Sequence, residues 1–146
     1  MMMRLETVAK DLTAKLKAAS SEQQRVAGLV ACRLALQATP MNYPVVLETL
    51  DQLQQYGVLP PQRIAELSNL AAQLDEKYFE LQDNAEGDAD LQTEALRLFS
   101  QARTVSALSF AGGGDALIAA MEAIYEASAT NDDGSKIFKV MLSILS

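Results

Sequence analysis

The sequence predicts an all-α fold, a single-domain bundle of six or seven helices over residues 1–146. Apolar residues recur at steps of three and four along most of the chain, which is the period of an amphipathic helix. Nowhere do apolar and polar residues alternate as they do in a half-buried strand. The chain has 146 residues, 49% of them apolar, which is enough to bury one core.

The first two predicted helices cover residues 5–19 and 21–38. One apolar stripe runs along the first. Ser20 and Ser21, followed three residues later by Gln23 and Gln24, predict a capping box at the start of the second. The second helix is apolar on nearly every face, so we expect it at the centre of the bundle. Arg33 lies among these apolar residues, and we expect its guanidinium to form a structural ion pair where it leaves the core.

Prolines open the third and fourth predicted helices. Pro44 and Pro61 suit a first turn, where the missing N–H has no helical partner, and Gly57 can take the left-handed conformation that ends the third helix. The fourth helix carries a coiled-coil seam that should pack along a neighbour: Ile64, Leu67, Ala71, Leu74, Tyr78 and Leu81. We expect these two helices to form an αα-hairpin.

An acidic stretch, residues 83–90, separates the fourth helix from the fifth. It has four acids and no large apolar residue, so we expect a solvated loop. The fifth helix should start at Leu91 and end at the glycines 112–114, because each glycine costs a helix about 1 kcal/mol. Asp115 should cap the sixth helix, and a turn at 131–135 should lead into the last one.

The composition excludes several classes of function. With 12 basic and 19 acidic residues the net charge is −7, which argues against nucleic-acid binding because phosphates need clustered lysines and arginines. The chain has no histidine, the usual general base and zinc ligand, so most familiar catalytic constellations are absent. The last helix is too short to span a bilayer. We therefore predict no nucleic acid and no membrane among the partners.

Cys32 is the only cysteine, so no internal disulfide can form. It lies in the middle of the second helix among apolar residues, and we expect a core thiol rather than a nucleophile. No apolar leader follows the N-terminal methionines. Together these features predict a reducing, cytoplasmic location.

Three stretches resemble ligand sites, but each lacks a required residue. Residues 83–94 have the length of an EF-hand loop, yet its third and fifth positions are Ala85 and Gly87, which carry no side-chain oxygen. The glycines 112–114 precede a helix as in a phosphate cradle, but no Lys-Ser or Lys-Thr follows. Residues 131–135 have no later carboxylate to complete a cage. We predict no catalytic residue, no cofactor and no metal.

Two groups of carboxylates are the candidate partner-binding residues. The first group lies in the acidic stretch: Asp83, Glu86, Asp88 and Asp90. The second lies on adjacent turns of the sixth helix: Asp115, Glu122 and Glu126. No basic residue offsets the second group within its helix, so we expect a solvated face or a face presented to a basic partner.

These observations favour a non-enzymatic protein–protein interaction domain, such as an adaptor, a regulator or an immunity-type protein, whose acidic helical face binds a basic protein. The first alternative is a small-ligand or divalent-metal-dependent helical enzyme that uses Asp115, Glu122 and Glu126. The second is a self-associating module, a homodimer through the C-terminal helix, which is apolar almost all round. The absence of histidine ranks the enzyme below the other two.

Overall fold

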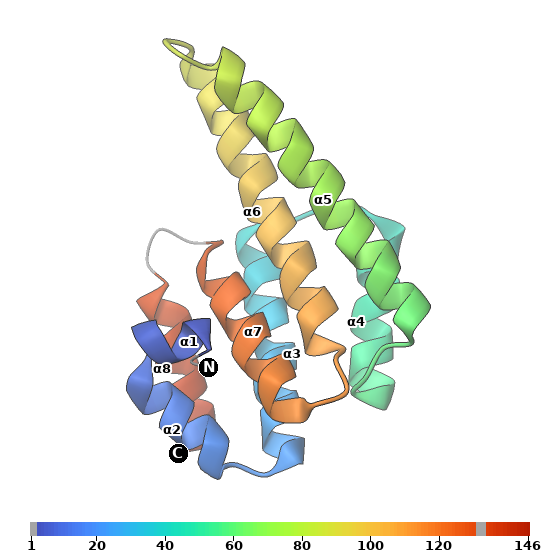
Figure 1. Ribbon diagram of the computed structural model, residues 1–146, viewed down its shortest axis with the longest axis vertical. Coiled ribbons are helices and arrows are strands. Elements are labelled where there is room, and N and C mark those ends of the chain that lie inside the picture. Colours follow the sequence, from blue (N-terminus) through green and yellow to red (C-terminus); the bar gives the residue numbers. More distant parts are fainter. Residues whose placement is uncertain (1–2, 131–133) are drawn as a thin grey trace.

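The structure, a computed structural model, describes residues 3–130 and 134–146. Within these residues it has eight α-helices and no strand (Figure 1), which confirms the all-α class. The helices are α1 (Arg4–Val8), α2 (Lys10–Ala18), α3 (Ser21–Ala38), α4 (Pro44–Tyr56), α5 (Pro61–Asn84), α6 (Ala89–Ala111), α7 (Ala116–Ser128) and α8 (Ser135–Leu145). Residues 131–133 of the predicted turn lie outside the described part of the chain.

The number of helices exceeds the prediction because the first expected helix is broken at Ala9. Ala9 has φ −147° and ψ 69°, well outside the helical region, and it separates α1 from α2. Neither proline nor glycine marks this break in the sequence. The bend lets both short helices bury leucines, Leu5 from α1 and Leu12 and Leu16 from α2. α1 packs on α7, and α2 packs on both α7 and α8.

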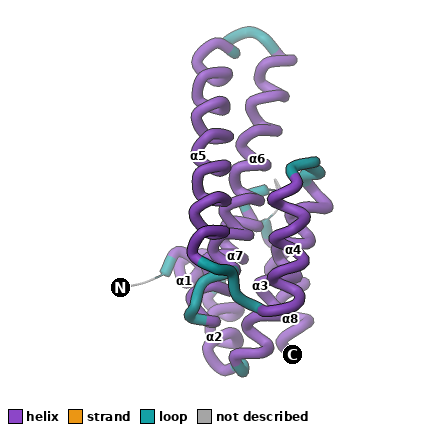
Figure 2. Tube along the Cα trace, turned by 90° about the vertical axis from the view of Figure 1, so that its right-hand side faces the viewer, coloured by secondary structure: helices purple, strands orange, loops and turns teal. Residues whose placement is uncertain are grey.

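α5 and α6 form an antiparallel hairpin whose far end projects beyond the other helices (Figure 1). Figure 2 shows the two long helices side by side in the perpendicular view. The seam predicted on α5 is confirmed, since Leu67, Ala71 and Leu74 are buried. The facing seam of α6 has the same steps of three and four: Ala95, Leu98, Ala102 and Val105.

The predicted hairpin of α4 with α5 is wrong. α5 packs along α6 over most of its length, and its contact with α4 is small, with an ion pair of 3.1 Å between Arg63 Nη2 and Glu48 Oε2. Pro60 is extended, with ψ 151°, and Leu59 is buried beside Gly112. This connection directs α5 toward α6, whose apolar seam matches its own.

The acidic stretch is a tight hairpin turn rather than a long solvated loop. α5 continues to Asn84 and α6 begins at Ala89, two residues earlier than predicted. The carboxylate of Asp88 caps α6, accepting hydrogen bonds of 3.0 and 3.1 Å from the amides of Asp90 and Leu91. Ala85 is buried at the turn. Because Asp88 supplies the N-cap and Asp90 lies in the first turn, these two acids stabilise the start of α6.

The core is organised around α7, which contacts α1, α2, α3, α6 and α8. α3 packs on it through a face of small buried side chains: Ala27, Gly28, Ala31, Cys32 and Ala35. A Cβ built on Gly28 would lie 3.6 Å from the Cα of Ala120, so the two backbones approach closely here. This face is the only fully buried one of α3, and larger residues beside it pack partly buried against the core. The central position predicted for α3 therefore applies to α7 instead.

The larger apolar side chains of α3, such as Leu29, are only partly buried, because its fully buried face consists of smaller residues. Arg33 is exposed, and among the described residues it makes no ion pair, so the structural pair predicted for it is absent. The capping box of Ser20 with Gln23 is confirmed.

α8 closes the bundle against α2, α3 and α7. Ile137 and Met141 are buried, whereas Val140 and Ile144 point outward and are exposed. α8 is thus an ordinary amphipathic helix with one face in the core. No helix in the residues that the structure describes has both the length and the apolar character needed to cross a membrane.

Candidate functional site

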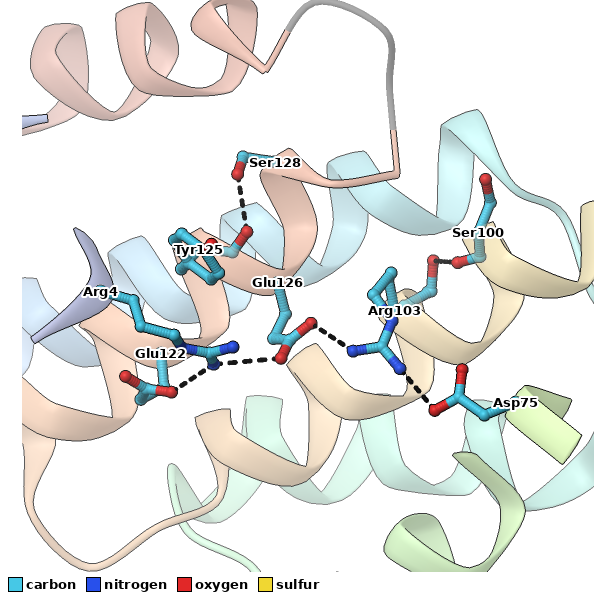
Figure 3. Close-up of polar contacts among 9 residues, drawn as sticks. Arg4, Asp75, Ser100, Arg103, Glu122, Tyr125, Glu126 and Ser128 are labelled. Carbon is cyan, nitrogen blue, oxygen red and sulfur yellow. Dashed lines mark hydrogen bonds and ion pairs between the residues drawn. The ribbon is translucent and has the colours of Figure 1, made fainter. Parts of the chain in front are cut away.

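Five charged side chains from four helices form a continuous chain of ion pairs (Figure 3). We call this set the ion-pair chain: Asp75, Arg103, Glu126, Arg4 and Glu122. Glu126 is at its centre and is only 4% exposed. The Oε1 atom of Glu126 accepts a hydrogen bond of 3.0 Å from Arg4 Nη2, and its Oε2 atom accepts one of 3.0 Å from Arg103 Nη1.

The two ends of the ion-pair chain are less buried than its centre. Arg103 Nη2 donates a hydrogen bond of 2.6 Å to Asp75 Oδ2 on α5, and Arg4 Nη2 donates one of 2.5 Å to Glu122 Oε2 on α7. Each arginine thus bridges two carboxylates. The ion-pair chain joins α1, α5, α6 and α7, which are far apart in the sequence.

Aromatic rings cover both guanidinium groups. Arg4 Cζ lies 4.4 Å from the ring centroid of Tyr125 and 5.9 Å from that of Phe110. Arg103 Cζ lies 5.5 Å from the ring of Phe99. Partial burial would by itself lower the pKa of Arg4, but hydrogen bonds and charge attraction from Glu122 and Glu126 outweigh it, so the pKa is raised. The guanidinium of Arg4 is therefore a fixed positive charge.

The acidic face predicted on the sixth helix is wrong for Glu126. Glu126 is buried between two arginines, and Glu122 is paired with Arg4. Asp115 is exposed and caps α7, as predicted, accepting a hydrogen bond of 2.9 Å from the amide of Ile118. The offsetting charges come from α1 and α6, outside the local helical spacing on which the prediction depended.

The same geometry weighs against the metal-dependent alternative. Both carboxylates that would hold a cation, Glu122 and Glu126, already accept hydrogen bonds from guanidinium groups. In residues 3–130 and 134–146 no three cysteine, aspartate or glutamate side chains gather closely enough to hold a metal ion. Asp115 contributes its carboxylate to the helix cap and not to this group.

A pocket of about 330 Å³ opens beside the ion-pair chain, between α5, α6 and α7. Its polar wall consists of Asp75, Arg103 and Glu126 together with the hydroxyls of Ser68, Ser106 and Ser109. The Nε atom of Arg103 is buried there without a hydrogen-bond partner. Both carboxylates of this wall bind Arg103, Asp75 through Oδ2 and Glu126 through Oε2.

The predicted carboxylates of the acidic stretch lie at the projecting end of the α5–α6 hairpin. Asp83, Glu86, Asp88 and Asp90 are all exposed, as the sequence predicted for this stretch. Glu76 and Glu80 extend the acidic surface along α5. Asp75 is paired with Arg103, and Glu94 is paired with Arg97. The side-chain hydrogen bond from Arg97 lowers the pKa of Glu94.

The other acids of this end make no ion pair within the described parts of the chain. We call them the hairpin acids: Glu76, Glu80, Asp83, Glu86, Asp88 and Asp90. Lys77 is the one basic residue among them. The structure therefore divides the predicted carboxylates. Glu122 and Glu126 pair with arginines, Asp115 is an exposed helix cap, and the carboxylates of the hairpin are exposed without an ion pair among the described residues.

Arg4, Arg25 and Arg103 have structural roles that the sequence analysis missed. Arg103 is the only basic residue between Arg97 and Lys136, so the scarcity of cations there was a usable signal for a partner of Glu126. Arg25 binds the glycine turn after α6, donating hydrogen bonds of 2.6 Å to the carbonyl of Gly113 and 2.9 Å to that of Gly114.

The glycine turn and Cys32 have structural roles. The carbonyls of the turn gather on the Arg25 guanidinium, which is the opposite polarity to a phosphate cradle. Cys32 is fully buried, as predicted, and this burial raises the pKa of its thiol to about 12. The thiol is therefore neutral at physiological pH.

Comparisons with protein-family models, with curated proteins and with solved structures gave no match to this chain. The functional conclusion accordingly depends on the geometry and charge of the described residues.

Proposed function

We propose that the protein is a non-enzymatic protein–protein interaction domain that binds a basic partner through the projecting end of the α5–α6 hairpin. One observation supports this above the others: the hairpin acids are exposed and lack ion-pair partners in the described residues. Such clustering raises the local negative potential and attracts a basic protein over several ångströms. The hairpin projects away from the bundle, so a partner can approach it freely (Figure 1).

The hairpin turn is stabilised by contacts of its own, which favours binding. Asp88 caps α6, and Gln92 Nε2 donates a hydrogen bond of 3.2 Å to the carbonyl of Ala85. Ala85 is itself buried against the hairpin. A surface that is fixed before association loses less conformational entropy when a partner binds.

Self-association through α8 is the second candidate. Val140 and Ile144 are both more than one-third exposed on the outer face of this helix. Two such faces could pair in a symmetric dimer, although two side chains cover little area compared with a standard interface.

The cytoplasmic location is part of the main proposal and is supported by the buried, unpaired Cys32.

The test is the salt dependence of association with the natural partner. Affinity capture from the native host at low salt would recover the partner, and its association rate would then be measured with purified proteins. The test variant neutralises the turn: Asp83→Asn, Glu86→Gln, Asp88→Asn and Asp90→Asn. The control variant removes the same charge elsewhere: Asp11→Asn, Glu22→Gln, Asp51→Asn and Glu66→Gln.

We expect the test variant to associate more slowly than either the wild type or the control variant at 0.01 M salt. The difference should shrink by 0.15 M salt, because the Debye length falls from about 30 Å to about 8 Å. Equal rates with equal salt slopes for all three proteins would show that the hairpin acids serve solubility and not binding.

A further inference from the structure

Apolar side chains are exposed on one side of the hairpin, next to the hairpin acids. A series of ring contacts connects this side of the hairpin to the ion-pair chain. The Arg103 guanidinium lies over the ring of Phe99, whose centroid is 5.3 Å from that of Tyr78. The Tyr78 ring in turn lies 5.2 Å from the ring of Phe79. Phe79 is 59% exposed, which is unusual for a phenylalanine.

Leu96 extends this row on α6. It precedes Phe99 by three residues, so both side chains lie on the same face of the helix. Leu96 is 64% exposed. The row continues toward the bundle through the Asp75–Arg103 pair to the pocket beside Glu126. We call the group formed by Phe79, Leu96 and Phe99 the apolar flank.

Carboxylates border the apolar flank along α5. At helical spacing Phe79 has Asp75 four residues before it, Glu76 three residues before it and Asp83 four residues after it. Three of the four nearest positions on the helix surface are therefore acidic. Glu76 and Asp83 are exposed and belong to the hairpin acids. The surface thus combines apolar anchors with a negative border.

We propose that the apolar flank is the docking site for a basic amphipathic helix of the partner protein. This inference depends on the proposed function and specifies its binding mode. The apolar face of such a helix would cover Phe79 and Leu96, while its lysines and arginines would lie along the acidic border and add their methylene stems to the contact. Aromatic residues with a polar rim are typical of the residues that dominate binding energy.

Charge distinguishes this occupant from a second copy of the chain. The chain has a net charge of −7, and Glu76 and Asp83 of the hairpin acids border the flank along α5. Two copies docked through this surface would bring like charges together, at a cost that a basic helix avoids. A basic segment also removes the repulsion among the hairpin acids themselves.

The test uses a display library of 18-residue helical peptides selected against the full chain. The best binders are then synthesised and titrated by fluorescence anisotropy. The test variant is Phe79→Ser with Leu96→Ser. The control variant is Leu47→Ser, which changes a residue of similar exposure on α4. Circular dichroism and melting temperature establish that both variants keep the fold, since the substituted side chains are exposed.

We expect the selected peptides to be basic and amphipathic, and to bind the test variant at least tenfold more weakly than the wild type and the control. Glu76→Gln with Asp83→Asn should also weaken binding relative to the wild type. This loss of affinity should grow as salt is lowered toward 0.01 M, where charge matters most. The inference is overturned if the selected peptides are acidic or non-amphipathic, or if the test variant binds them as well as the wild type. A wild-type dimer that the test variant disrupts, seen by analytical ultracentrifugation, would also overturn it.

The two proposals fail separately. If the natural partner loses affinity for the charge-neutralised turn but not for Phe79→Ser with Leu96→Ser, the proposed function holds and the apolar flank is not its docking site. If selected basic peptides need Phe79 and Leu96 while the natural partner ignores the hairpin acids, the flank binds such helices and the proposed function is wrong.

Discussion

Arg103 of α6 and Glu126 of α7 are joined by a hydrogen bond of 3.0 Å between Nη1 and Oε2, with the carboxylate almost completely buried. Arg4 binds the other oxygen of the same carboxylate. A glutamate that looks like part of an acidic surface in the sequence is thus the central link between four helices. Its charge is compensated within the chain, so the hairpin acids are the better candidates for a partner.

Glu126→Gln should lower the free energy of unfolding by about 3 kcal/mol, because it leaves the partly buried Arg103 with an incomplete set of acceptors. Glu48→Gln, which breaks the exposed pair with Arg63, should cost less than about 1 kcal/mol. Urea unfolding of both variants measures the difference. Equal small losses would contradict a structural role for the ion-pair chain.

Gly112→Ala should destabilise the protein by about 1–3 kcal/mol, the usual cost of overpacking. A Cβ at Gly112 would lie 2.4 Å from the side chain of Leu59, which is buried. Gly114→Ala is the matched control, because nothing lies within 4 Å of its Cβ position. The thermal midpoints of the two variants decide this point: a control that melts as low as Gly112→Ala would rule out the clash as the cause.

Ala31→Asp should unfold the protein, whereas Leu29→Asp should leave it folded with reduced stability. Ala31 is fully buried against the core, while Leu29 is partly exposed and an aspartate there can reach water. An unpaired buried charge costs several kcal/mol, comparable to a total stability of about 5–15 kcal/mol. Circular dichroism of both variants would show the contrast, and loss of helical signal in Leu29→Asp would place that residue in the core after all.

Stability should fall at high pH through ionisation of Cys32. Its pKa is raised to about 12 by burial, whereas in the unfolded chain the thiol ionises near about pH 8.5. The contribution of the buried neutral thiol to the free energy of unfolding is therefore complete below about pH 8.5. It is lost as the pH rises toward 12, at up to about 1.4 kcal/mol per pH unit. Cys32→Ala removes this slope. Unfolding midpoints of the two proteins from pH 7 to 11 should diverge above pH 9, and parallel curves would contradict the prediction.

The sequence by itself determined most of the helices, because their signals are local, but it has no such signal for the break at Ala9 that separates α1 from α2. The capping box at Ser20, the prolines at Pro44 and Pro61 and the N-cap at Asp115 each act within one or two turns. The steps of three and four fixed the buried seam of α5 in the same way. The exposed acids of the hairpin turn could likewise be predicted from composition alone.

Tertiary structure alone decided which helices pair and which charges meet. The apolar seam of α5 does not specify which helix packs against it. It packs on α6 rather than α4 because two features favour that packing: the connection at Leu59 and Pro60, and the matching seam of α6. Arg4 and Glu126 are separated by 122 residues, so no helical spacing could join them. Periodicity specifies one helix at a time, whereas the site depends on complementary shape and charge between distant segments, which exist only once the chain has folded.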